Sequence, residues 1–430
     1  MAVNGGTSFR IPWSAWVDER ELALSLPSGW SVDLAAIGSQ AGPASPGSER
    51  LDEALAHPIG CSRLEEMAAG AKSAAIAVED LTRPAAVGPA VESMLDQLES
   101  AGLTSERVVI LMAVGGHAPM NLAELRLKLG PRVLARCDVW SHHPYENLVD
   151  LGTSRGGLPI KVNRLFVEAD LRLAVGSVLP HPYAGFGGGG KIVLPGLAGI
   201  ETLEMNHRPA VTGLSGAGLG IVEGNRARAE MEEIALKTGL LAVLNIVPGA
   251  RREPLGYFFG HPVAAHRAAV EFARRVYTVS IRPGADAVLL NAYPKDGEIL
   301  QVGNAFNAYR SCQPPPAREG GTVIVTAACP FGRGHHSLHG PGMRLYRDPV
   351  ERGYLAGRTL LVYAPSVSTA DVRKSFWHGY EHLKSWDDVC DRLSSRHPGG
   401  GRMLVFPTAP LALPASDHSE ADGAERDGVD

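Results

Sequence analysis

Apolar runs alternate with amphipathic segments along the first two thirds of the chain. Short, wholly apolar runs predict buried strands, and apolar residues that recur every three or four positions predict helices. The expected strands cover residues 74–79, 108–114, 133–140, 171–175 and 241–247. The expected helices cover residues 87–100, 122–129 and 226–240. Strands that alternate with helices predict an α/β fold with a largely parallel sheet.

A second unit of the same kind begins near residue 283. Its expected strands cover residues 285–291, 322–326, 359–363 and 403–406, and its expected helices cover residues 346–356 and 386–393. Residues 1–70 should be a strand-poor lead-in, and a helix at 262–276 should bridge the two units. We therefore predict two α/β domains, 1–275 and 276–414, with the active site in the cleft between them. The polar, acidic residues 415–430 predict a disordered tail.

Composition narrows the class of protein. The chain has 430 residues, 45% of them hydrophobic, and a net charge of −5. It has no basic patch interleaved with aromatic residues and no apolar window long enough to cross a bilayer, so neither nucleic acid nor a membrane is an expected partner. Five scattered cysteines and the lack of an apolar signal core near the first residue favour a cytoplasmic protein with reduced thiols.

Residues 179–207 hold an unusual concentration of reactive side chains. Four glycines at 187–190 lie between His181 and Lys191, and His207 follows. A glycine run lets the backbone approach a bulky ligand and adopt positive φ angles. Lys191 would place an amine beside that ligand, and the two histidines can bind a metal or move protons near neutral pH. The segment predicts a cofactor site.

Two nucleotide-binding motifs almost match this loop. Residues 185–190 satisfy G-x-G-x-x-G, but no acidic residue for a ribose contact stands clearly about 20 positions further on. Residues 185–191 satisfy G-x-x-x-x-G-K, but Ile192 replaces the hydroxyl residue that would hold Mg²⁺. Pro195 also opposes a long helix at this point. We expect neither standard nucleotide site.

Polar motifs follow three of the expected strands. Asp80, Thr82 and Arg83 follow the first, His117 follows the second, and the loop of Lys191 follows the third. Each motif alone is often structural; an aspartate and an arginine this close usually form an ion pair. Because ligands bind at the carboxyl ends of strands in open α/β sheets, their joint placement predicts one shared cleft.

Taken together, these motifs resemble the lactate racemase family, whose members use a nickel-pincer nucleotide. The resemblance covers about residues 75–330. It rests on DLTRP at 80–84, GH at 116–117, PH at 180–181, GFGGGGK at 185–191, PG at 195–196, NH at 206–207, EGN at 223–225, YPKD at 293–296, LQ at 300–301 and EGG at 319–321.

The resemblance implies a role for each matching residue. Lys191 would form a thioamide with the cofactor, a pyridinium mononucleotide that carries two sulfur-bearing arms, and His207 would ligate its nickel. His117 and His181 would be the acid/base pair, and Arg83 would lie near the substrate carboxylate. Further expected contacts are Asp80, Thr82, Gly188 and Gly189 for the cofactor, and Gln301 and Asn304 for the substrate. Separate proteins would have to make the cofactor.

These residue types suit the inversion of C2 in a 2-hydroxy acid. The proton on C2 is weakly acidic, so passing a hydride to the cofactor and back avoids a carbanion. Two histidines give each enantiomer a base, an arginine holds a carboxylate through paired hydrogen bonds, and a thioamide with an imidazole suits nickel. We expect a racemase or epimerase. Epimerisation of a larger sugar acid, a catalytically silent relative that binds a nucleotide or metal, and phosphate transfer are the alternatives.

The chain departs from the family pattern at two positions. Gly187 replaces a serine in the glycine loop, and Asn304 replaces a lysine three residues beyond Gln301. Loss of that cation predicts that lactate is not the best substrate, and a shorter side chain leaves space for a larger or hydroxylated substituent. His142 and His143 are expected to be a loop pair, although a place near the site stays open for them. The histidines of segment 335–339 resemble a metal-binding cluster, but no acidic or thiol ligand is close, so a solvated loop is expected.

Overall fold

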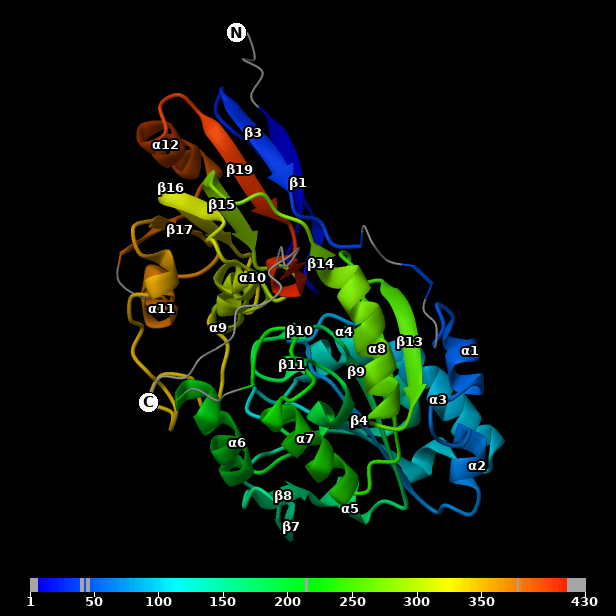
Figure 1. Ribbon diagram of the computed structural model, residues 1–430. Coiled ribbons are helices and arrows are strands. Elements are labelled where there is room, and N and C mark those ends of the chain that lie inside the picture. Colours follow the sequence, from blue (N-terminus) through cyan, green and yellow to red (C-terminus); the bar gives the residue numbers. More distant parts are fainter. Residues whose placement is uncertain (1–6, 39–41, 44–46, 213–215, 377–378, 416–430) are drawn as a thin grey trace, which may run out of the picture.

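The computed structural model describes residues 7–38, 42–43, 47–212, 216–376 and 379–415. The expected tail, apart from Ala415, lies outside these residues. They form two six-stranded sheets, one in each half of the molecule in Figure 1, with helices packed around both. This arrangement confirms an α/β fold with two largely parallel sheets.

The first sheet has the strand order β13-β12-β9-β4-β5-β6 and is parallel except for β13. Its strands are β4 (Ala74–Val78), β5 (Val108–Met112), β6 (Asp138–Ser141), β9 (Leu171–Ser177), β12 (Ala242–Pro248) and β13 (Pro254–Gly260). Ile76 and Val78 enter the core on one face of the sheet, and Ala75 and Ala77 enter the core on the other. Burial on both faces explains why these strands are apolar throughout.

Helices and small hairpins complete the first domain. The helices are α1 (Leu51–Ala56), α2 (Leu64–Ala68), α3 (Gly88–Ser100), α4 (Leu122–Arg136), α5 (Arg164–Glu168), α6 (Ile200–Thr212), α7 (Arg226–Lys237) and α8 (Ala264–Tyr277), with the short turns η1 (Ser105–Arg107) and η2 (Gly189–Ile192). The hairpins are β7 (Leu148–Thr153) with β8 (Pro159–Asn163), and β10 (Pro180–His181) with β11 (Gly185–Phe186). The expected strand at 133–140 is wrong in its first half, because α4 continues beyond the kink at Gly130.

The second sheet has the order β18-β17-β16-β15-β19-β3 and is parallel throughout. Its strands are β3 (Trp30–Leu34), β15 (Ala285–Asn291), β16 (Ala317–Thr326), β17 (Thr359–Tyr363), β18 (Tyr380–Leu383) and β19 (Gly401–Phe406). The remaining elements are α9 (Ile299–Val302), α10 (Phe306–Ser311), α11 (Thr369–Ser375), α12 (Trp386–Arg396), η3 (Gly303–Ala305), η4 (Gly353–Leu355), η5 (Ala409–Leu411) and the pair β14 (Thr278–Val279) and β20 (Leu413–Pro414). The helix expected at 346–356 is reduced to η4, since Pro349 and Gly353 both oppose a helix.

The first 34 residues differ most from expectation. β1 (Ser8–Trp13) pairs with β2 (Arg20–Ser25), and β3 forms an edge of the second sheet beside β19. In Figure 1 these blue strands lie beside the red β19. The expected strand-poor lead-in is therefore wrong, and these strands join the second sheet although the expected boundary put them in the first domain. Apolar and polar residues alternate in β1 and β3, which was an available signal for strands, but the sheet that they join depends on pairing with distant segments.

The turn between β1 and β2 contacts both domains. The backbone N–H groups of Ser14 and Ala15 donate to the Asp296 carboxylate at 2.8 and 3.1 Å. The Trp16 indole donates to the carbonyl of Leu81, in the first domain, at 2.9 Å. These contacts hold the segment after β15 against the segment after β4.

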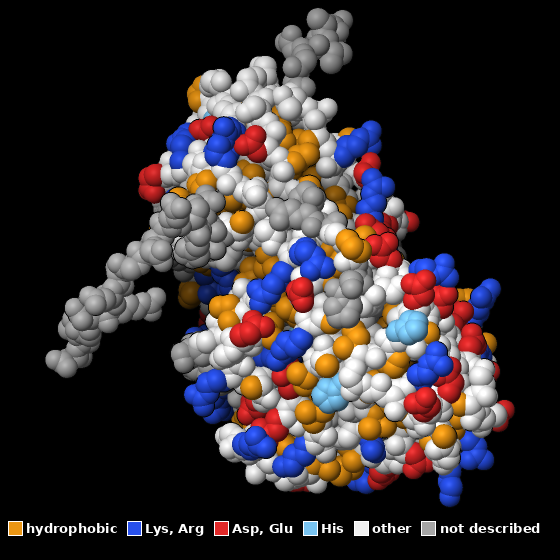
Figure 2. All heavy atoms as spheres, turned by 45° about the vertical axis from the view of Figure 1, so that its right-hand side comes forward, with side chains coloured by type: hydrophobic (Ala, Val, Ile, Leu, Met, Phe, Trp, Pro, Cys, Tyr) orange, Lys and Arg blue, Asp and Glu red, His pale blue; other side chains and the backbone are white. Residues whose placement is uncertain are grey.

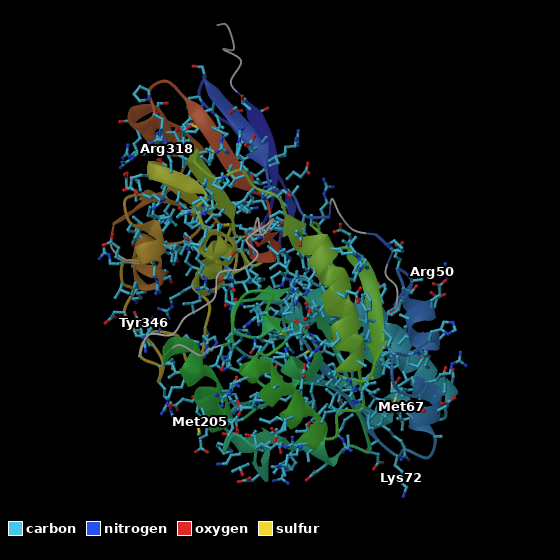
Figure 3. The ribbon with its side chains drawn as sticks, viewed as in Figure 1. Arg50, Met67, Lys72, Met205, Arg318 and Tyr346 are labelled. Atoms are coloured by element: carbon cyan, nitrogen blue, oxygen red, sulfur yellow. The ribbon has the colours of Figure 1, made fainter. Side chains whose placement is uncertain are left out.

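The two sheets point their carboxyl ends toward each other. Lys72, just before β4, lies at the far end of one domain in Figure 3, and Arg318, at the start of β16, lies at the far end of the other. The loops that follow the strands therefore meet between the domains, where α/β proteins bind ligands. On the face in Figure 2, acidic and basic side chains are interspersed. No helix in the described ranges is long and apolar enough to cross a membrane.

Candidate active site

The glycine loop is shaped by its own protein surroundings. Gly188 and Gly189 have φ angles of +72° and +57°, which other residues rarely adopt. A Cβ on Gly188 would lie 2.6 Å from the Val178 side chain, and one on Gly189 would lie 2.9 Å from the His266 ring. The sequence suggested that glycine leaves room for a ligand. At these two positions it is needed because the loop packs tightly against the domain.

Buried polar side chains hold the carbonyl groups of this loop. Arg228, which is 1% exposed, donates to the carbonyls of Ala184 and Gly188 at 3.1 Å each. His266 donates to the carbonyl of Gly187 at 2.8 Å. Burial lowers the pKa of Arg228 to about 10, which still leaves the guanidinium charged at neutral pH. The loop therefore has a fixed shape that carries Lys191 into the space between the domains.

A cavity of about 370 Å³ lies between the two domains. The first domain contributes the residues that follow β4, β5 and β9, together with one turn of α6, and the second contributes residues from 295–304 and 336–339. The titratable and amide side chains that line it are Glu79, Asp80, Arg83, His117, His181, Tyr183, Lys191, His207, Lys295, Gln301, Asn304, His336 and His339.

Asp80 orients His117 and is itself held by Thr82. The Asp80 carboxylate accepts from His117 Nδ1 at 2.6 Å and from the Thr82 hydroxyl and backbone N–H at 2.6 and 2.9 Å. Burial alone would raise the pKa of Asp80, but His117 and Arg83 hold it well below its usual range. With Nδ1–H directed at a carboxylate, the neutral His117 ring turns an Nε2 lone pair toward the cavity.

His181 has the opposite arrangement. Its Nδ1 accepts from the backbone N–H groups of Tyr183 and Ala184 at 3.2 and 3.1 Å, so the neutral ring carries its proton on Nε2. Burial, followed by the charges of Lys191 and Lys295, lowers its pKa well below the usual value. The two histidines thus present an acceptor and a donor to the same cavity.

Two buried amines lie in the cavity wall. Lys191 is 9% exposed and Lys295 is 3% exposed. Burial, followed by the charge of Arg83, lowers the pKa of both amines well below the usual value. Within the described part of the chain, neither ammonium group has a hydrogen-bond acceptor or an ion-pair partner. Burial therefore disfavours the charged form of both amines, and the neutral form of a lysine is nucleophilic.

His207 belongs to a row of rings along the cavity. Its Nδ1 donates to the carbonyl of Leu203 at 3.0 Å, within α6, which leaves Nε2 with a free lone pair. Burial, with the nearby His339 and Lys191, lowers its pKa to about 3, so the ring is neutral at physiological pH. His339 lies 6.0 Å from His207 and 4.8 Å from His336, and His336 lies 5.2 Å from His117, measured between ring centres.

Gln301 and Asn304 form the opposite wall. Gln301 Nε2 lies 3.5 Å from His117 Nε2. The Asn304 amide donates to the Gln301 backbone and side-chain oxygens at 2.8 and 3.2 Å. Asn304 therefore holds Gln301 in place and brings no charge into the cavity.

The structure brings together nearly all of the residues that the sequence singled out. Asp80, Arg83, His117, His181, Gly188, Lys191, His207, Gln301 and Asn304 all line the cavity. Thr82 borders a smaller adjoining pocket of about 70 Å³, and its hydroxyl contacts the main cavity indirectly, by donating to Asp80 and accepting from Arg83 at 3.0 Å. Gly189 faces His266 instead.

Three residues of the cavity were missed. His336 and His339 line it, so the expectation of a solvated loop is wrong for them, whereas His335 is exposed. Lys295 is part of the YPKD motif, but it was assigned no role from the sequence. Its position just after the expected strand 285–291 could have indicated a place in the cavity. His142 is outside this group: it is buried in the first domain, where it donates to the Ala198 carbonyl at 3.0 Å.

Fold and cavity together define a two-domain α/β enzyme with buried amines and imidazoles between its domains. Comparison with known proteins identifies the family. Residues 17–219 match the model of the lactate racemase N-terminal domain. The chain is 33% identical over 293 residues, 67% of each chain, to the lactate racemase of Thermoanaerobacterium thermosaccharolyticum. It is 30% identical over 294 residues, 68% of each chain, to that of Lactiplantibacillus plantarum. The chain belongs to the lactate racemase family, and these relatives indicate a racemase, an isomerase.

Solved structures agree with this assignment. The lactate racemase apoprotein from T. thermosaccharolyticum superposes with a TM-score of 0.73 at 25% identity, over 95% of this chain and 100% of the other. A protein from Thermotoga maritima superposes with a TM-score of 0.62 at 19% identity, over 82% of this chain and 97% of the other, and shows the shared fold alone.

Proposed function

We propose that this racemase inverts C2 of a 2-hydroxy acid by reversible hydride transfer, with a nickel-pincer nucleotide linked covalently to Lys191. The observation that carries the proposal is the convergence of Lys191, His207, His117 and His181 on one cavity. Membership of the lactate racemase family supports the same reaction class.

The residues around His207 fit a cofactor that brings its own metal ligands. A hydrogen bond from the other ring nitrogen to a carbonyl, as at Leu203, is typical of a metal-binding histidine. Among the residues that the structure describes, no group of three or more His, Cys, Asp or Glu side chains is arranged to hold a metal ion. Nickel at His207 would therefore need ligands from a bound molecule. When bound, the nickel-pincer nucleotide supplies the acceptor and donor of the hydride.

Side chains and backbone of this protein would attach the cofactor and contact it. The buried Lys191 amine is poised for acylation because its charged form is disfavoured. Asp80 and Gly188 face the cavity as cofactor contacts. Thr82 and Gly189 act indirectly, Thr82 through the carboxylate of Asp80 and Gly189 by letting the loop pack.

Two histidines move the hydroxyl proton on opposite faces of the substrate. His117 accepts it at Nε2, and Asp80 stabilises the imidazolium that results. His181 directs its Nε2–H at the substrate oxygen, and it can take the proton of the other enantiomer only in the tautomer that leaves Nε2 free. The planar 2-oxo acid formed in between has to stay inside the cavity between the two domains until it is reduced again.

Substrate selection falls to Arg83, Gln301 and Asn304. Arg83 binds the carboxylate, since a guanidinium matches two carboxylate oxygens. The neutral Asn304 and the polar rings of His336 and His339 favour a substrate with a polar or hydroxylated substituent at C3 over lactate. A sugar acid epimerised at C2 is the closest alternative. A silent relative that binds only a nucleotide or metal is less well supported, because binding alone has no need of the Asp80–His117 pair.

The test requires protein made together with the cofactor-synthesis proteins, which are the expected partners. Peptide mapping should find the added mass on the peptide of Lys191. His207→Ala should lose nickel, whereas His117→Ala and His181→Ala should keep nickel and lose turnover. Substrate deuterated at C2 should yield product that retains most of the label. Unmodified Lys191 in fully active enzyme, or complete exchange of the label with water, contradicts the proposal.

A further inference from the structure

Lys295 holds a buried amine at the boundary of the two domains. It follows the carboxyl end of β15, and its backbone N–H donates to the carbonyl of Ala292 at 2.8 Å. The next residue, Asp296, is fixed by Ser14 and Ala15 from the β1–β2 turn. Lys295 borders both the main cavity and the adjoining small pocket.

Among the residues that the structure describes, none is a hydrogen-bond or ion-pair partner for the Lys295 amine. The two carboxylates nearest in the cavity are already occupied: Glu79 accepts from Lys128 at 3.0 Å and from the Ser177 hydroxyl at 2.7 Å. Asp80 accepts from His117 and Thr82. An unpaired buried cation is costly, so a lysine that served only the fold would be expected to have an acceptor. An anion from outside the protein would satisfy it.

We propose that Lys295 binds the substrate carboxylate together with Arg83 and thereby selects carboxylic acids over uncharged analogues. This inference rests on the proposed function. Arg83 and Lys295 line the same cavity, and the charge of Arg83 lowers the pKa of Lys295, so one anion in this cavity can contact both groups. Asn304 cannot take this part, because its amide brings no charge and donates to Gln301. The cation missing at position 304 is thus supplied from another segment of the chain.

The first experiment uses the apoprotein, so that it does not depend on turnover. Lactate and lactamide differ only in the carboxylate, and the melting temperature is measured with each. Lactate should raise it more than lactamide in the wild type. The difference should shrink by more than half in Lys295→Met, persist in Lys295→Arg, and be unchanged in Lys161→Met, which removes a lysine from a surface pair with Glu201. Equal responses to acid and amide in the wild type, or an undiminished difference in Lys295→Met, overturn the proposal.

The second experiment uses the cofactor-loaded enzyme. Lys295→Met should keep the Lys191 adduct and the nickel content, and should raise KM for the best 2-hydroxy acid about tenfold to a hundredfold, as expected for one lost charge-assisted hydrogen bond, with a smaller effect on kcat. Loss of the cofactor in this variant would assign Lys295 to the cofactor phosphate and overturn the proposal. If wild-type loaded enzyme turns over no 2-hydroxy acid, the proposed function fails, and the apoprotein measurement still decides the role of Lys295.

Discussion

Lys128 and Lys295 are both buried near the domain boundary, but their surroundings are opposite. Lys128, on α4, is 1% exposed and donates to Glu79 and to the carbonyls of Arg83 and Ala85 at 3.0, 2.9 and 2.9 Å. Lys295 is 3% exposed and has no acceptor among the described residues. The amine of Lys128 has its hydrogen-bond acceptors within the fold, whereas the amine of Lys295 would gain one only from a bound ligand.

This difference extends to the regions around the two lysines. Behind the cavity, Lys128 and Glu79 hold the segment that carries Asp80 and Arg83 in one conformation. Inside the cavity, Lys191 and Lys295 face open space. A region in which every polar group has a partner resists change, and a region with unpaired cations has free energy to gain from an anion. Substitutions in each region should show where the boundary between the two lies.

The largest effect is expected where the partnered region meets the cavity, at Asp80. Asp80→Asn should reduce kcat of the loaded enzyme by about 10²- to 10⁴-fold, because an amide N–H facing Nδ1 removes the tautomer that leaves Nε2 free to accept a proton. Steady-state rates measure this. Thr82→Ser, which keeps the hydroxyl that donates to Asp80, is the matched control and should stay close to wild type. An active Asp80→Asn would mean that His117 is not the base.

A smaller but still severe effect is expected at Lys128. Lys128→Met leaves Glu79 buried without its cation and should lower the free energy of unfolding by about 3 to 5 kcal/mol, measured by urea denaturation. Lys295→Met should leave that free energy unchanged or raise it, since it removes an unpaired charge. If both variants lose stability equally, the two lysines do not differ in the way described.

The smallest effect concerns pH and a histidine of the partnered region. Burial lowers the pKa of His142 to about 4, below the 6.5 of a free imidazole. As the pH falls, the unfolded chain therefore binds a proton before the folded protein does, and stability is lost between pH 6.5 and 4. The loss from His142 should reach about 2 kcal/mol by pH 5. Denaturation at pH 7 and pH 5 should show a smaller difference for His142→Gln; an equal difference would contradict the assignment.

The strands at the centre of both sheets were predictable because their own residues show a pattern that is typical of buried strands. Residues 74–78 and 285–291 are apolar on both faces, and burial on both faces is what a central parallel strand requires. β3 was missed although WSVDL alternates apolar and polar residues, as a half-buried strand does; what the alternation could not give is its pairing with β19, far along the chain. The helix expected at 346–356 failed for the converse reason: its periodic residues were noticed, and its proline and glycine were not given enough weight.

The residues of the candidate site also fall into two groups, those that local motifs predicted and those that only the tertiary structure placed there. Local motifs were enough to single out Lys191, His207, His117, His181 and Arg83, because short-range spacing and chemistry identify each one. The sequence alone also determined the α/β class and the family resemblance. Only the tertiary structure decided that His336, His339 and Lys295 enter the same cavity, and that Lys128 has partners where Lys295 has none among the described residues. Burial and the presence of a partner depend on segments that meet only when both domains have folded, and no local pattern records them.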